Sequence, residues 1–146
     1  MIGGKGLAVG ALLSLITATT TWGLTRAQVP GATDPAVTQA SIGQTVCRLH
    51  YTATVRPSKE WSNALKHRLL REQHQPGTVQ DYELDHLIPL NIGGAPTDPR
   101  NLWLQRWDEA RVKDEDESEL YHAVCSGRIT LEQAQRRMLD KWGPKP

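Results

Sequence analysis

Two adjacent residues, Asp85 and His86, have side chains that together could hydrolyse a phosphodiester bond. A carboxylate suits a hard divalent cation such as Mg²⁺, and an imidazole that titrates near neutrality can take a proton from water. A metal ion that offsets charge on the phosphate, with a base that activates the nucleophile, is the minimum for this chemistry. Asp-His pairs are common, so the spacing alone leaves open a solvated pair without a catalytic role.

Short strands and loops are expected to position this pair. The pattern from Tyr82 to Leu90 predicts a strand that runs into a Pro-bent loop, and residues 91–100 have Gly and Pro at turn positions. Asn101 to Leu104 is expected to be a second short strand, followed by a helix from about Asp108 to Val124. Adjacent side chains on a strand point to opposite faces. At the end of a strand, however, both can border one cavity.

Further elements are expected on both sides of these strands. Residues 28–44 contain Pro and Gly and predict an extended leader, and the β-branched run from Thr45 to Val55 predicts a strand or two. Ser58 is expected to cap a helix over Lys59–Gln73 with an apolar stripe at Trp61, Leu65 and Leu69. Thr130 and Gln133 form a capping box for a last helix that ends near Trp142.

The first 27 residues have the pattern of an export signal. Lys5 precedes an uncharged, mostly apolar run from Gly6 to Leu24, and the small residues of Thr25–Ala27 fit cleavage after Ala27. An uncleaved anchor is the alternative, because about 19 uncharged residues could span a bilayer. Either interpretation places the remainder outside the cytoplasm, either secreted or periplasmic.

The charge distribution leaves nucleic-acid binding open. Without residues 1–27 the net charge is about −1, which is not that of a tight nonspecific DNA binder. Residues 48–71 are nevertheless rich in Lys and Arg, whereas residues 114–119 are acidic. These could equally be two solvated helix faces. The candidate nucleic-acid contacts are Lys66, Arg68, Arg71, Arg100, Arg106 and Lys113.

The cysteines Cys47 and Cys125 are an isolated pair, which in an exported protein usually forms a disulfide. Closing that loop would stabilise the fold by roughly 4 kcal/mol on the loop-entropy model. Zinc binding is the alternative, with His50 and His122 each three residues from a cysteine, but the compact spacing of zinc ligands is missing.

The segments DHLIP, Gly93-Gly94 and Asn101-Leu102 resemble the HNH endonucleases, the ββα-metal or His-Me finger superfamily. The resemblance implies that Asp85 is a metal ligand, that His86 is the general base and that Asn101 holds the loop between two strands. The longer pieces YELDHLIPL, GGAPTDPRNLW and VCSGRITLEQAQ are similar to small exported bacterial proteins with HNH-like signatures. The expected fold is therefore α+β, with a β-hairpin and helix as the ββα-metal core, flanking helices and an HNH-like nuclease domain over residues 45–146.

One position departs from that family pattern. The usual ligand on the helix falls at Ala110, which cannot bind metal. Glu83, Asp108 and Asp114 are the candidate substitutes, for a divalent ion expected to be Mg²⁺ or Mn²⁺. Glu83 could instead pair with Arg100 or Arg106.

The resemblance therefore favours a metal-dependent nuclease that cuts DNA or RNA. The alternatives are a degenerate HNH fold that only binds nucleic acid and an interaction domain of the envelope. Trp103 and Trp107 are expected in the core rather than as base-stacking platforms, and His67 and His74 at the surface. Lys113 could touch a phosphate or form a solvated network with Glu109 and Glu117.

Overall fold

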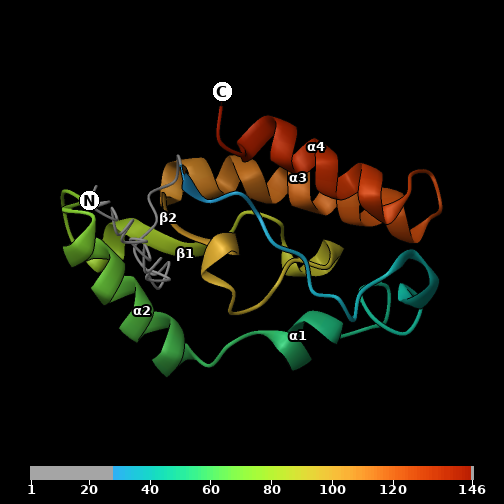
Figure 1. Ribbon diagram of the computed structural model, residues 1–146, viewed down its shortest axis with the longest axis horizontal. Helices are drawn as coiled ribbons and strands as arrows, with labels where there is room; N and C mark the ends of the chain where they lie inside the picture. Colours follow the sequence, from blue (N-terminus) through green and yellow to red (C-terminus); the bar gives the residue numbers. More distant parts are fainter. Residues whose placement is uncertain (1–27, 146) are drawn as a thin grey trace, which may run out of the picture.

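A two-stranded antiparallel sheet and four helices form the fold of residues 28–145, the part of the chain that the computed structural model describes. The strands are β1 (Tyr82–His86) and β2 (Leu102–Arg106), and the helices are α1 (Tyr51–Val55), α2 (Lys59–Glu72), α3 (Trp107–Cys125) and α4 (Leu131–Trp142). Short 3-10 turns connect them (Figure 1). The mixed α+β class is confirmed, whereas the expected export signal lies outside the described residues.

The β1–β2 hairpin lies between α2 and α3 (Figure 1). In its register Asp85 pairs with Trp103 and His86 with Leu102. Because successive side chains alternate between faces, Tyr82, Leu102 and Leu104 point to one face, where they pack against Leu65 and Leu69 of α2. The other face presents Asp85 and Trp103 towards α3.

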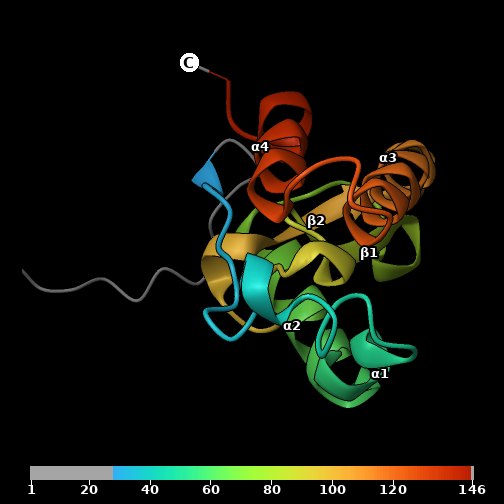
Figure 2. The ribbon, with the colours of Figure 1, turned by 90° about the vertical axis from the view of Figure 1, so that its right-hand side faces the viewer.

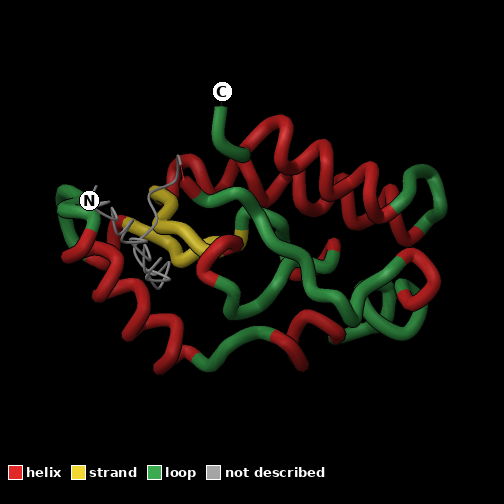
Figure 3. The backbone as a smooth tube through the Cα atoms, in the orientation of Figure 1, coloured by secondary structure: helices red, strands yellow, loops and turns green. Residues whose placement is uncertain are grey.

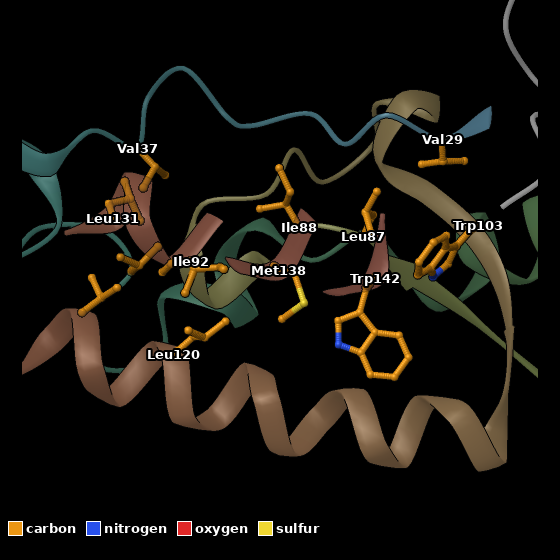
Figure 4. Packing of buried hydrophobic residues seen from close by; sticks show 13 residues of the cluster. Val29, Val37, Leu87, Ile88, Ile92, Trp103, Leu120, Leu131, Met138 and Trp142 are labelled. Carbon is orange, nitrogen blue, oxygen red and sulfur yellow. The ribbon is translucent and has the colours of Figure 1, made fainter. Parts of the chain in front are cut away.

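The larger apolar core lies on the α3 side of the hairpin and extends to α4, which runs beside α3 (Figures 1 and 2). Trp103 is wholly buried there, as expected, and Figure 4 shows it in the same cluster as Leu87 and Trp142. The buried members are Val29, Val37, Val46, Leu87, Ile88, Ile92, Trp103, Leu120, Val124, Leu131, Ala134, Met138 and Trp142.

Two of the predicted helices begin at the predicted caps. The Ser58 side chain accepts a hydrogen bond from the Trp61 amide at the start of α2. Thr130 and Gln133 form the reciprocal capping box of α4, which ends at Trp142. These short polar caps satisfy amides that the first helical turn leaves unpaired.

Residues 28–44 belong to the packed structure rather than forming a separate leader. Val29 is wholly buried and Val37 is 6% exposed. The segment crosses the loop between the strands (Figure 3), where Thr33 forms a β-bridge with Gly94 and the Gly31 amide donates to Arg100 O. The segment is partly extended, with a 3-10 helix over Gln39–Ser41, and it covers part of the core.

The strand predicted over Thr45–Val55 is wrong, because this segment forms turns and then α1. Local side-chain bonds explain the difference: the Thr45 hydroxyl donates to Ser41 O and the Thr54 hydroxyl to Tyr51 O. Such bonds compete with strand pairing.

The predicted disulfide joins Cys47 to Cys125, at the end of α3, with 5.5 Å between the two Cα atoms. It is compatible with an oxidising compartment. Within residues 28–145, no helix is long and apolar enough to cross a membrane.

Candidate functional site

Asn101 fixes the loop that joins the two strands. Its side chain is fully buried, its Oδ1 accepts from the Ile88 amide at 2.8 Å, and its Nδ2 donates to Ile88 O at 2.9 Å and Ala95 O at 3.1 Å. Gly94 makes this close approach possible, because a Cβ there would stand 1.7 Å from Ile88 O. One amide therefore holds both ends of the turn that follows His86.

Asp85 is held by two donors from neighbouring elements. Its Oδ2 accepts from the indole Nε1 of Trp103 at 2.7 Å, the cross-strand neighbour in the sheet register. The same oxygen lies 3.0 Å from the Nζ of Lys113 on α3. The Asp85 side chain is 11% exposed, so these contacts are made almost out of water.

Lys113 is the most unexpected member of the site. Sequence reasoning placed it at the surface, either on a phosphate or in a solvated network, but its side chain is only 1% exposed. Its Nζ contacts Asp85 Oδ2, Glu117 Oε1 at 2.5 Å and His86 O at 2.8 Å. A lysine ammonium has three protons to donate, and each has an internal acceptor here. Lys113 is therefore not available to bind nucleic acid.

Lys113 is the ammonium of a charged cluster that has more carboxylates than positive charges. Its carboxylates are Glu83, Asp85, Asp114 and Glu117. Burial, and then the negative charges of Asp85 and Asp114, raise the pKa of Glu83 to about 7. Burial likewise raises the pKa of Glu117, although Lys113 opposes that shift. For Lys113, burial favours the neutral form, but the attraction of Asp85 and Glu117 prevails and raises its pKa, so the ammonium stays charged. The cluster thus balances part of its negative charge by holding protons.

His86 is buried in a neutral form suited to accepting a proton. Burial lowers its pKa, and the positive charges of Arg56 and Lys113 act in the same direction, against the Pro96 carbonyl and Asp85. Its Nε2 lies 2.9 Å from Pro96 O. A carbonyl can only accept a hydrogen bond, so we assign the ring proton to Nε2. This tautomer leaves the lone pair on Nδ1 free to take up a proton.

A cavity of about 220 Å³ lies between α2 and the hairpin, with His86 in its wall. Glu83 also borders the cavity, and Arg56 and Lys59 contribute positive charge. Its aromatic members are Trp61 and Trp107. The full lining is Arg56, Pro57, Lys59, Trp61, Ser62, Asn63, Lys66, Glu83, Leu84, His86 and Trp107.

The expectation that Trp107 lies in the core is wrong. Its side chain is 42% exposed, and its indole nitrogen donates to Gln80 O at 2.8 Å, which fixes the ring beside the cavity. Sequence reasoning also overlooked Arg56 and Lys59 as site residues. The signal that could have indicated them is their place in the basic stretch: Arg56 caps the end of α1 and Lys59 begins α2.

The remaining candidates are dispersed. Arg100 forms an exposed ion pair with Asp98 at 2.6 Å, and Arg106 pairs with Asp108 at 3.6 Å, so neither arginine is the ion-pair partner expected for Glu83. Asp114 is exposed on α3. Lys66 borders the cavity and donates to Tyr82 O. Arg68 and Arg71 line a neighbouring groove of about 390 Å³ together with Trp61, which also borders the cavity beside His86.

The residues around Asp85 do not fit the divalent ion that the HNH resemblance implies. The cation beside this carboxylate is the Lys113 ammonium, and Ala110, at the usual ligand position, is an apolar residue 2% exposed. Gln105, on the same sheet face, is buried and has no hydrogen-bond partner for either amide atom within the described structure. Over residues 28–145 no group of three or more His, Cys, Asp or Glu side chains is arranged to hold a metal ion.

Comparison with known proteins returns no match to this chain among family models, curated proteins or solved structures.

Proposed function

We propose that this chain is an exported HNH-like protein that binds a nucleic-acid phosphodiester in the cavity beside His86 and cleaves it. The cavity itself carries this proposal. It combines a neutral, buried imidazole with the positive charges of Arg56 and Lys59 and with the aromatic side chains of Trp61 and Trp107. Positive side chains suit phosphates, and exposed indoles offer platforms for bases.

In the proposed reaction His86 acts as the general base. Its Nδ1 takes the proton of the attacking water or hydroxyl as the new oxygen–phosphorus bond forms, while Arg56 and Lys59 offset the negative charge of the phosphate. The bond from phosphorus to the leaving oxygen then breaks. Glu83 borders the same cavity and holds a proton for part of the time near neutral pH, so it can return a proton to that oxygen.

The residues behind the cavity position His86. Asn101 secures the loop that follows it, and the Pro96 carbonyl fixes its tautomer. Asp85 contacts Trp103 and Lys113, so in this proposal it supports the site from behind rather than touching the substrate. In the HNH enzymes a divalent ion supplies charge neutralisation; because the residues here do not fit one, no step is assigned to it.

A cleavage assay on the oxidised protein tests the proposal. Supercoiled plasmid and single-stranded RNA would be incubated with Mg²⁺, with Mn²⁺ or with EDTA. His86→Ala should lose at least about a hundredfold in rate. His67→Ala is the matched control, because His67 is exposed on α2 and borders no part of the cavity. Cleavage by His86→Ala at the wild-type rate would contradict the assignment.

A second candidate function is nucleic-acid binding without turnover. The Lys113 ammonium beside Asp85 favours it, because an HNH site that has lost its metal could persist as a binding module. In that case an oligonucleotide should bind in EDTA with an affinity that falls as salt increases. Arg56→Ala should weaken binding, and neither substrate should be cut under any of the three metal conditions.

A further inference from the structure

The Lys113 ammonium occupies a place that could otherwise hold an inorganic cation. Three oxygen atoms surround its Nζ, from the Asp85 and Glu117 carboxylates and the His86 carbonyl, at 3.0, 2.5 and 2.8 Å. Carboxylate and carbonyl oxygens are the ligands that hard divalent cations prefer. Here the positive charge among these oxygens is that of the Lys113 side chain rather than of a bound metal ion.

The position of Lys113 along α3 accounts for this. Residues three and four apart lie on one face of a helix, so Lys113 shares a face with Ala110 and Glu117. Ala110 and Lys113 are 2% and 1% exposed, which places that face against the hairpin. The helix therefore lacks a ligand at residue 110 and brings a cation to the same interface one turn later.

We propose that Lys113 is a built-in replacement for a divalent metal ion: its ammonium prevents metal binding at Asp85, and its removal opens a divalent-cation site at Asp85 and Glu117. A metal ion in contact with these oxygens would face the ammonium at close range, where like charges repel strongly in a buried site. Without the ammonium, the two carboxylates would be left without their shared cation. The proposal does not depend on nuclease activity, because its readout is metal binding.

Calorimetric titration with Mn²⁺ tests the proposal on three proteins: the wild type, Lys113→Ala and the control Arg111→Ala. Arg111 is an exposed residue of the same helix. The wild type and the control should show no saturable binding at Asp85 up to millimolar Mn²⁺. Lys113→Ala should bind one Mn²⁺ with a dissociation constant at least about tenfold below the millimolar limit set by the wild type. Mn²⁺ should also raise the melting temperature of Lys113→Ala while leaving that of the wild type unchanged.

Two results would overturn the proposal. One is stoichiometric Mn²⁺ binding by the wild type that Asp85→Asn abolishes. The other is a folded Lys113→Ala that binds Mn²⁺ no better than the wild type. If Lys113→Ala does not fold without metal, folding on addition of Mn²⁺ supports the proposal. If it fails to fold even then, Lys113→Gln, which keeps both carboxylates and can still donate a hydrogen bond to one of them, takes its place, and the wild-type titration decides independently.

Discussion

Replacing Asn101 by alanine should destabilise the protein more than a substitution of similar size at the surface. The wild-type side chain is fully buried and bonds to the amide and carbonyl of Ile88 and to the carbonyl of Ala95. Asn101→Ala leaves these three backbone groups without their side-chain partner at once. A buried backbone group left unpaired costs about 1–3 kcal/mol.

The expected loss is about 3–5 kcal/mol. It lies below the sum of three full penalties because a carbonyl has a second lone pair and water could enter the space left by the amide. The bond from Ala32 to Asn101 Oδ1, at 3.4 Å, is long and adds little. Against a typical total of about 5–15 kcal/mol, a loss of this size would be plain in any unfolding experiment.

Urea unfolding followed by tryptophan fluorescence measures this difference, with Asn63→Ala as the control. Asn63 is exposed on α2, so its substitution should change stability by less than about 0.5 kcal/mol. A loss below about 1 kcal/mol for Asn101→Ala would refute the reasoning. It would mean that the loop after His86 holds its shape without the amide.

Three further predictions concern other parts of the molecule. Gly94→Ala should destabilise strongly, because the new Cβ would stand 1.7 Å from the backbone oxygen of Ile88; an unchanged melting temperature would contradict that close approach. Reducing Cys47–Cys125 should lower the melting temperature by several degrees or more, and two alkylatable thiols in the native, unreduced protein would contradict the disulfide. Because the pKa of Glu83 is raised to about 7, the folded state binds its proton more tightly than the unfolded chain does. The contribution of Glu83 to stability should therefore fall as the pH rises from about 4.5 to about 7, and Glu83→Gln should flatten that decline in urea midpoints measured across this range.

Local signals in the sequence predicted most of the helices and the hairpin. Ser58 and Thr130 are caps whose hydrogen bonds reach only three residues ahead, so their effect can be predicted directly from the sequence. Val29 and Thr45 were misjudged for the opposite reason. Val29 is buried by residues far along the chain. The β-branched Thr45 is compatible with a strand as well as with the turn that forms here, in which its hydroxyl donates to Ser41 O.

In the candidate site, too, local sequence features were predicted and features that depend on tertiary packing were not. The motif placed Asp85, His86 and Asn101 together because neighbouring strands bring them together. Nothing in the local pattern around Lys113 distinguishes a solvated lysine from a buried one, since the acidic residues that follow it favour exposure. Its burial depends on how α3 lies against the hairpin, and that is a matter of tertiary packing: Trp103 of the hairpin and Leu120 of α3 belong to the same apolar cluster.

The disulfide encloses α1, α2, the hairpin and α3 in one covalent ring. The connection from α2 to β1, residues 73–78, lies inside that ring and is largely exposed. A protease that cuts there once would leave both pieces linked through Cys47–Cys125. The nicked protein would migrate as a single species until reductant is added, and the two halves of the site would stay covalently linked.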